Sequence, residues 1–417
     1  MSRQIHLAIF LLVGGLVASD CAAATFPDAH EPPPGDWTGH VFKLSQDYPS
    51  VPPAAADGPW LKFDFRTDPG RYIAAVYAYV LEGNVEADWD VQNNLVRKWY
   101  HAPWMHAGDH GREYIRGLTR ERTTPRPPAG QNGELGPAQT ACAQNWAVGF
   151  FNAPGGYTVG QVWSNPDAPD AAKSRFPEGT VVAKLLFTAA GVTQVPYLAG
   201  ALEWQANVND IPPSDLDCHE QKARTRQTVW LLQMDLAVRD SRADSSTGWV
   251  FATYSFDGGR PGASPWEKMI PVGVMWGNDP LLTASAYASG QRTNETWINP
   301  DLKTPQHLGW LRRLNGPVDN SASSCLSCHA TAEVPAALPM IPPATMPEAN
   351  RMRWFQNYKA GQAFDPSSIS TDYSLQIAFG IQAFRAAHQP PAATVMRPGA
   401  AKIQINGREE FQINRGD

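Results

Sequence analysis

Hydrophobic residues recur every three to four positions in two stretches of the chain, and this spacing predicts helices. The first helix is expected over 69–81, because Asp68-Pro69 is typical of a helix start and Gly83 of a helix end. The second is expected from about Ser370 onward, with its apolar residues on one side: Leu375, Ile377, Ala378, Ile381 and Phe384. Weaker patterns predict two more helices, over 112–121 and 347–360.

The middle of the chain has a different pattern, in which short apolar runs are separated by Gly, Pro and Asn. We expect a hairpin here, with strands over 146–151 and 157–163 around the turn residues 152–156. Further strands are expected over 180–188, 228–238 and 248–256. A run of strands without regular helices between them predicts an antiparallel sheet. The stretch 257–324 is expected to be irregular and to lead to the residues described below.

The fold class expected from these elements is α+β, with a mainly antiparallel β domain and helical N- and C-terminal extensions. A Pro/Gly-rich link at 123–140 separates an N-terminal extension, 25–140, from a β domain, 141–330, and 331–417 forms the C-terminal helical extension. Residues 1–24 are expected to be a signal peptide, because Arg3 precedes an apolar run and small residues follow it.

The net charge and the expected export of the chain limit the classes of function that it can have. A net charge of -6 argues against a nucleic-acid partner, and the apolar run at 7–18 is too short to span a bilayer. We therefore expect an exported, soluble protein of the periplasm with no membrane span. Of the 5 cysteines, Cys21 lies in the expected signal peptide and is removed with it. Cys142 and Cys218 either form a disulfide in the oxidising compartment or stay as free buried thiols.

The strongest chemical motif is Cys325-Leu326-Ser327-Cys328-His329. Two cysteines about one helical turn apart match the two vinyl groups of a porphyrin, to which their thiols add. The histidine that follows then falls under the iron as its proximal ligand. We predict one covalent haem c, attached through Cys325 and Cys328, with His329 as the metal ligand.

Three other interpretations of the motif stay open, and one of them is a chance match of the spacing. A zinc site would need two more ligands, which Cys218 and His219 would supply. A redox-active dithiol needs only the two cysteines of the motif, although such pairs usually lie near a βαβ unit.

Lys184 and Asp235 each interrupt an otherwise apolar strand. A buried ammonium or carboxylate is costly unless it is paired, neutralised or used chemically. Lys184 is either such a group or a sheet-edge residue whose ammonium reaches water. Asp235 is either a general base with a raised pKa or a structural partner of a backbone amide or of Arg239.

These strands and the motif together resemble the cytochrome P-460 family, c-type monohaem proteins linked to hydroxylamine oxidation. The resemblance covers roughly residues 145–330. Four blocks carry it, in the family's order: residues 176–184, Asp235 before 238–240, the Trp-Val-Phe strand at 249–251, and Cys325 to His329.

The resemblance implies a role for each of these residues. Lys184 falls at the place of the lysine that the family cross-links to the haem edge. Asp235 falls where the family can carry a glutamate over the distal face, so it would take protons during turnover. The implied substrate is a small nitrogen-containing molecule, hydroxylamine or nitric oxide, and the implied electron acceptor is another cytochrome.

Two alternatives belong to other functional classes. A non-enzymatic electron carrier would have a sixth iron ligand, from Met340, Met346, Met352 or a histidine of the N-terminal part: His101, His106 or His110. These histidines are otherwise hydrogen-bonded loop residues. A gas-binding protein of the cytochrome c′-beta type would bind nitric oxide without oxidising hydroxylamine.

Overall fold

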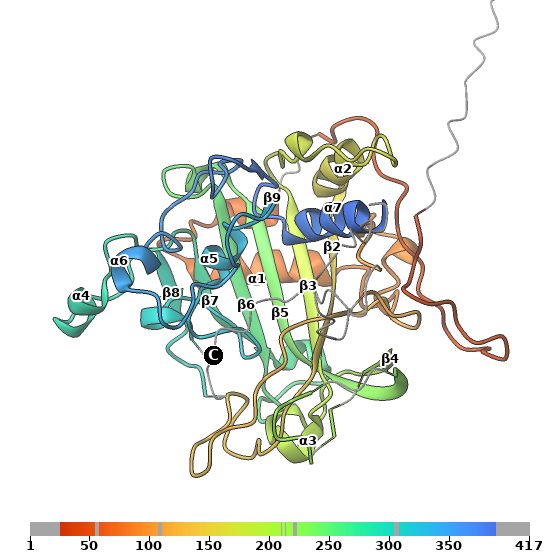
Figure 1. The fold of residues 1–417 in the computed structure, drawn as a ribbon, viewed down its shortest axis with the longest axis horizontal. Helices are drawn as coiled ribbons and strands as arrows, with labels where there is room; N and C mark the ends of the chain where they lie inside the picture. Colours follow the sequence, from red (N-terminus) through yellow and green to blue (C-terminus); the bar gives the residue numbers. More distant parts are fainter. Residues whose placement is uncertain are drawn as a thin grey trace, which may run out of the picture.

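A single antiparallel sheet of eight strands forms the centre of the molecule (Figure 1). The structure is a computed structural model and describes residues 26–54, 58–106, 111–209, 211–212, 214–219, 223–303 and 308–388. The strand order is β1-β2-β3-β5-β6-β7-β8, and β4 pairs with β5. The strands are β1 Thr119–Arg120, β2 Asn145–Phe151, β3 Val181–Thr188, β4 Glu203–Val208, β5 Thr225–Arg239, β6 Trp249–Phe256, β7 Met269–Met275 and β8 Thr296–Ile298. This architecture is of the α+β class.

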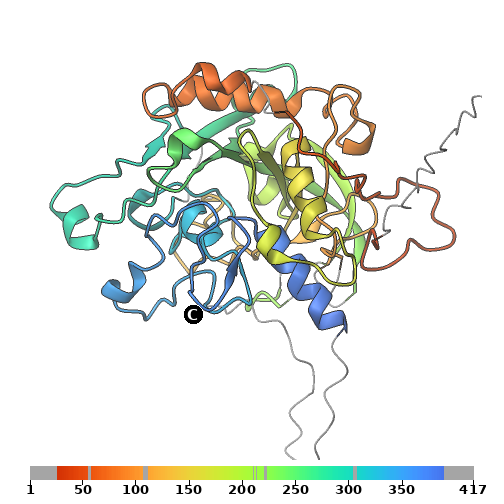
Figure 2. The same cartoon turned by 90° about the horizontal axis from the view of Figure 1, so that it is seen from above.

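Helices cover both faces of the sheet (Figure 2). Helix α1, Pro69–Leu81, lies on one face, and α5, Cys325–His329, lies on the other with α7, Leu375–His388. Each face has its own cluster of buried apolar residues. The remaining short elements are α2 Ala153–Val162, α3 Gly191–Gln194, α4 Ala284–Ala288, α6 Glu348–Arg351, β9 Glu333–Val334 and β10 Ile369–Ser370, with 3-10 turns at Pro59–Lys62, Val91–Asn93, Ala171–Lys173, Pro196–Leu198, Ser241–Ala243, Pro265–Lys268 and Trp310–Arg312.

Helix α1 forms where its apolar periodicity predicts it. Its buried side recurs at helical spacing and packs on the sheet: Tyr72, Ile73, Val76 and Val80. Pro69 begins the helix, and Gly83 follows its end with a positive φ of 77°, a conformation that favours glycine. The predictions for α7 and for β3, β5 and β6 are also confirmed.

The predicted hairpin at 146–163 is wrong in its second half. Residues 145–151 form β2, but 153–162 form helix α2. The turn residues act as a helix start, because the Asn152 side chain accepts a hydrogen bond from the Gly155 amide and Pro154 occupies the first turn. The partner of β2 is therefore β3, which follows in antiparallel register.

The helix predicted over 112–121 does not form, and the structure describes all of these residues. The buried carboxylate of Glu113 instead accepts hydrogen bonds from the backbone amides of Ile115, Arg116 and Leu118. These bonds close a turn, after which β1 pairs with β2. The helix predicted over 347–360 shrinks to the four residues of α6.

The stretch 257–324 is not irregular throughout, as we had expected. It contains strands β7 and β8 and the short helix α4. Pro271 and Gly273 interrupt the apolar pattern of β7 in the sequence. Pro271 lies beside a register shift between β6 and β7, where a strand tolerates the missing amide hydrogen.

The division of the chain at 123–140 stays a prediction, but the segments on its two sides pack together. Trp60 and Val76 share one buried cluster with Leu185 and Leu236. Cys142 and Cys218 form a disulfide with a Cα–Cα distance of 5.5 Å. The predicted signal peptide lies outside the described residues, and no helix within them is long and apolar enough to cross a membrane.

Candidate functional site

The Cys-Leu-Ser-Cys-His motif forms the short helix α5, which is fixed at its start and on its buried side. The Ser324 side chain accepts a hydrogen bond from the Ser327 amide, and the Ser327 hydroxyl in turn accepts from the Ser324 amide. The Ser324 hydroxyl also donates to Asn278 at 2.8 Å. Leu326 is fully buried in the cluster on this face of the sheet. These contacts hold the motif in one orientation against the sheet.

The cysteine sulfur atoms and the histidine nitrogen of α5 suit the attachment of a haem. Cys325 and Cys328 are free thiols on partly exposed residues. The His329 Nδ1 lies 2.8 Å from the Tyr373 carbonyl oxygen, so Nδ1 carries the proton and donates it. This bond leaves the Nε2 lone pair of His329 for a metal, the arrangement found in metal-binding histidines.

The zinc interpretation of the motif loses one of the two further ligands that the sequence offered for it. Cys218, which was needed as a further ligand, is bonded to Cys142. Within the parts of the chain that the structure describes, no group of three or more His, Cys, Asp and Glu side chains is placed to hold a metal ion.

Lys184 and Asp235 are direct neighbours across the sheet. Lys184 of β3 is in register with Asp235 of β5, and Asp235 is in register with Thr253 of β6. Because side chains at one register level of a sheet lie on the same face, the three residues form a polar row under α5. We call Lys184, Asp235 and Thr253 the polar row.

The ammonium of Lys184 is paired, and Lys184 is not at a sheet edge. Strand β3 lies between β2 and β5, and the Lys184 Nζ is 2.8 Å from the Glu121 Oε1. Burial opposes the charge on Lys184 most strongly, yet Glu121, Asp235 and Asp319 together keep the pKa of this ammonium above its usual value. The lysine is therefore held as a cation within the row.

Asp235 is bonded to side chains and not to Arg239, which pairs with Asp244. Its carboxylate accepts a hydrogen bond from the Thr253 hydroxyl at 2.8 Å and from the Gln233 amide at 2.9 Å. The Thr253 hydroxyl lies 3.9 Å from the Cys325 Sγ. Thr253 thus connects the polar row to the motif helix.

Burial and neighbouring charges set the protonation of this site. Burial raises the pKa of Asp235 to about 7, the charge of Asp319 raises it too, and Lys184 opposes both. Burial lowers the pKa of His329 to about 4, so its imidazole is neutral at pH 7. Burial also raises the pKa of Cys328 to about 12, which keeps the thiol protonated. Asp235 is thus the group of this set whose pKa lies near neutrality.

The structure brings all five residues proposed from the sequence to one face of the sheet. The sequence did not identify the residues that support them: Glu121, Gln233, Thr253, Asp319 and Tyr373. Gln233 lies two residues before Asp235 on the same strand face, and Thr253 lies opposite Asp235 in the neighbouring strand. Strand alternation could therefore have indicated these two residues from the sequence. Glu121, Asp319 and Tyr373 come from loops whose position follows from the tertiary fold.

Of the N-terminal histidines considered as iron ligands, His101 makes a hydrogen bond and His106 a ring contact. His101 is buried, and its Nδ1 accepts a hydrogen bond from the Ser45 amide at 3.2 Å. The ring of His106 lies 5.1 Å from that of Trp104. His110 lies outside the described residues. His101 is thus a hydrogen-bonded loop residue in this structure.

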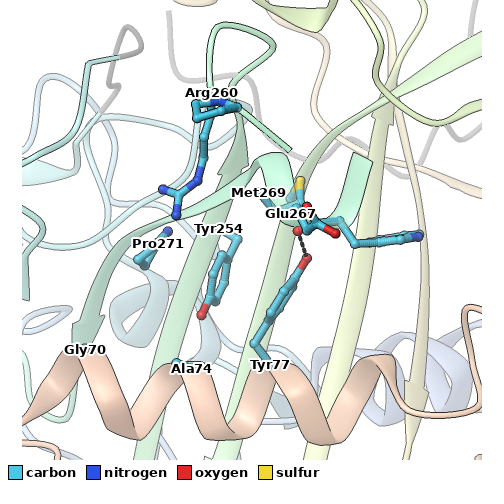
Figure 3. A pocket seen from close by; sticks show the side chains of 10 residues that line it. Gly70, Ala74, Tyr77, Tyr254, Arg260, Glu267, Met269 and Pro271 are labelled. Carbon is cyan, nitrogen blue, oxygen red and sulfur yellow. Dashed lines mark hydrogen bonds between the residues drawn. The ribbon is translucent and has the colours of Figure 1, made fainter. Parts of the chain in front are cut away.

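A concave region lies on the opposite face, between α1 and strands β6 and β7 (Figure 3). This cavity of about 550 Å³ contains Tyr77 and Tyr254, whose stacked rings are 4.4 Å apart. Arg260 reaches toward it from the loop after β6. Tyr254 follows Thr253 in β6, so the cavity and the polar row lie on opposite sides of one strand.

Comparison of the chain with protein-family models, curated proteins and solved structures gives no significant match.

Proposed function

We propose that the chain is a periplasmic c-type cytochrome that carries one haem on Cys325 and Cys328 and oxidises a small nitrogen-containing substrate. The observation that carries the proposal is the polar row. It places a paired lysine and a carboxylate on the same sheet face as the motif helix, and Thr253 links the two parts at 3.9 Å from Cys325. A structural attachment site alone has no need of these charges.

Each residue of the site has a distinct part in the proposed reaction. The bound haem would supply a metal that holds the substrate and accepts its electrons. His329 would hold that metal through Nε2, while the Tyr373 carbonyl fixes its ring. Asp235 takes a proton from the substrate, a task for which a pKa of about 7 is suited.

Lys184 is the residue that distinguishes the cross-linked P-460 type from other c-type proteins. Its position in the polar row supports this assignment, because Lys184 is in register with Asp235 and Thr253, and Thr253 lies beside Cys325 of α5. The antiparallel order β3-β5-β6 followed by the motif is consistent with a P-460-like domain. Electrons would leave to another cytochrome of the periplasm.

The proposal is tested by absorption spectra of the protein from a host that attaches haem c. A strongly red-shifted and broadened Soret band is expected, and Lys184→Arg should convert it to a sharp c-type band because arginine keeps the charge but not the amine. A sharp band in the unchanged protein would refute the cross-link.

Turnover is tested separately, by hydroxylamine-dependent reduction of an acceptor cytochrome. Asp235→Asn should lower this rate by about 100-fold or more, the usual contribution of a general base. Binding of nitric oxide should be unchanged in the variant. Equal turnover rates in the two proteins would refute the role of Asp235 as the base.

One observation favours a second function, that of an electron carrier. Met346 and Met352 pack, partly buried, against the cluster that contains Leu326 of α5. A methionine that bound the metal would slow its reaction with cyanide. Fast cyanide binding in the unchanged protein, and in Met346→Leu and Met352→Leu alike, would exclude this function for these two residues.

A further inference from the structure

A second carboxylate, Asp319, lies beside Asp235, and one amide binds both. The Gln233 Nε2 donates to both oxygens of Asp235, at 2.9 and 3.0 Å, and to the Asp319 Oδ2 at 3.2 Å. Two oxygens that bond the same nitrogen are at most about 6 Å apart. The two carboxylates, both on partly buried residues, are therefore close enough for the charge of Asp319 to act on Asp235.

The orientation of the Gln233 amide is fixed by its other contact. Gln233 is fully buried, and its Oε1 accepts a hydrogen bond from the Val318 amide at 3.2 Å. A flipped amide would turn its oxygen toward two carboxylates and leave the Val318 amide without this acceptor. The nitrogen of Gln233 must therefore face Asp235 and Asp319.

Asp319 is itself held in place by a turn just before the motif helix. Its Oδ2 accepts a hydrogen bond from the Gly316 amide at 2.7 Å. A Cβ on residue 316 would lie 2.1 Å from the Gln233 Nε2, so only glycine allows this approach. Arg122 of the N-terminal segment donates to the Asp319 carbonyl at 3.3 Å and pairs with Glu134.

The charges around the pair decide how it binds protons. Asp319 and Asp235 repel each other, while Lys184 attracts both and is itself paired with Glu121. Asp319 raises the pKa of Asp235, and the hydrogen bonds from Gln233 and Thr253 lower it. The charge of Asp319 therefore favours the protonated form of Asp235.

We propose that Asp319 and Asp235 form a carboxylate pair that Gln233 joins, and that Asp319 is the positioning residue through which Asp235 acts as the proton acceptor of the site. This role rests on the proposed function. In the step concerned, an N–H or O–H proton of the substrate moves to Asp235, and the electron pair of the broken bond stays on nitrogen or oxygen. The pair changes from two carboxylates to one carboxylate and one carboxylic acid.

The experiment is an infrared titration of the haem-loaded protein that follows the carbonyl band of the protonated carboxyl. Asp235→Asn should remove the band that titrates near pH 7 in the unchanged protein. Asp319→Asn keeps an oxygen for the Gly316 amide but removes the charge, so the midpoint should fall by about one to two pH units.

Gln233→Met gives a second, opposite test. It removes the amide that stabilises both carboxylates, so the midpoint of Asp235 should rise. Asp257→Asn is the matched control, since Asp257 also accepts a backbone amide hydrogen bond in a turn but lies after β6. This control should leave the midpoint unchanged.

The outcomes separate this inference from the proposed function. An unchanged midpoint in Asp319→Asn, or a lower one in Gln233→Met, would overturn the pair whether or not hydroxylamine is oxidised. Opposite shifts in the two variants would support the pair even in a protein without that activity. If the protein oxidises hydroxylamine, Asp319→Asn should also move the acid limb of the pH–rate profile to lower pH.

Discussion

The two faces of the central sheet are built from alternate residues of the same strands, yet their chemistry differs. Toward α1, Leu185, Leu236 and Ala252 are buried and apolar. Toward α5, the residues next to them in sequence form the polar row. A step of one residue along each strand therefore changes an apolar packing surface into a charged site.

The contrast assigns stability mainly to the α1 face and the proposed chemistry to the α5 face. The α1 face gains free energy from apolar burial, at about 25 cal/mol for each Å² removed from water. The α5 face retains two charges that interior packing would exclude unless they are compensated. Substitutions on the two faces should therefore have different signatures, and the predictions below test this difference.

The largest expected effect concerns the motif on the α5 face. Replacing Cys325 and Cys328 by serine should abolish covalent haem attachment, because both thioether bonds need a thiol. The matched control replaces Cys142 and Cys218, which form the disulfide. The control should lose about 2–5 kcal/mol of stability and keep its haem. Haem staining after denaturing electrophoresis distinguishes the two, and a stained motif variant would contradict the attachment.

The next effect concerns the α1 face. Ile73→Ala should lower the free energy of unfolding by about 2–5 kcal/mol, because loss of the buried Ile73 side chain would leave a cavity between α1 and the sheet. Leu95→Ala, at a side chain that is 99% exposed, should change stability by no more than about 0.5 kcal/mol. Denaturant titration measures both. A changed absorption spectrum in the Ile73 variant would show that the two faces are not independent.

A smaller effect is expected from the pH dependence of stability. The pKa of Asp235 is about 7 in the folded protein and near 4 in an unfolded chain, so the folded state binds the extra proton between these values. Stability from this group is therefore present at low pH and is lost as pH rises through 7.

Asp235→Asn removes this dependence. Relative to the unchanged protein, the variant should gain about 2 kcal/mol between pH 5 and pH 8. Denaturant titrations at the two pH values measure the gain, with Asp257→Asn as the control. An equal difference at both pH values would mean that the pKa of Asp235 is not raised by folding.

The smallest effect is on the reduction potential of the haem-loaded protein. In protein whose sharp c-type band shows that Lys184 is not cross-linked, Lys184→Met removes a positive charge from the α5 face, which favours the oxidised metal, so the potential should fall by tens of millivolts. Lys268→Met, on the 3-10 turn before β7, makes the same charge change elsewhere and should alter the potential much less. Spectroelectrochemical titration compares them, and equal shifts would remove Lys184 from the site.

Local patterns in the sequence predicted much of the sheet but not its edges. Strands β3, β5 and β6 are mostly buried and rich in apolar and β-branched residues, so burial and strand propensity agree there. Helix α2 was missed because Asn, Pro and Gly serve equally as turn residues and as a helix start. Strand β7 was missed because Pro271 and Gly273 break its pattern.

The residues of the candidate site divide in the same way, into those that local sequence patterns indicated and those that they did not. Lys184 and Asp235 stood out because charges in apolar strands are costly. Their pairing depends on the register of β3 and β5, which alternation alone does not give. Glu121 and Asp319 lie outside the strands and far apart in the sequence, and no local pattern marks either one. Only the tertiary fold brings their carboxylates to the polar row.

The most direct test of the central claim is peptide mass mapping of the exported protein. The account predicts that the peptide containing Cys325 to His329 carries one haem, and that the cross-linked form also joins it to the peptide containing Lys184. Recovery of the motif peptide with two free thiols, or with haem bound at another peptide, would contradict the assignment of the α5 face as the haem site.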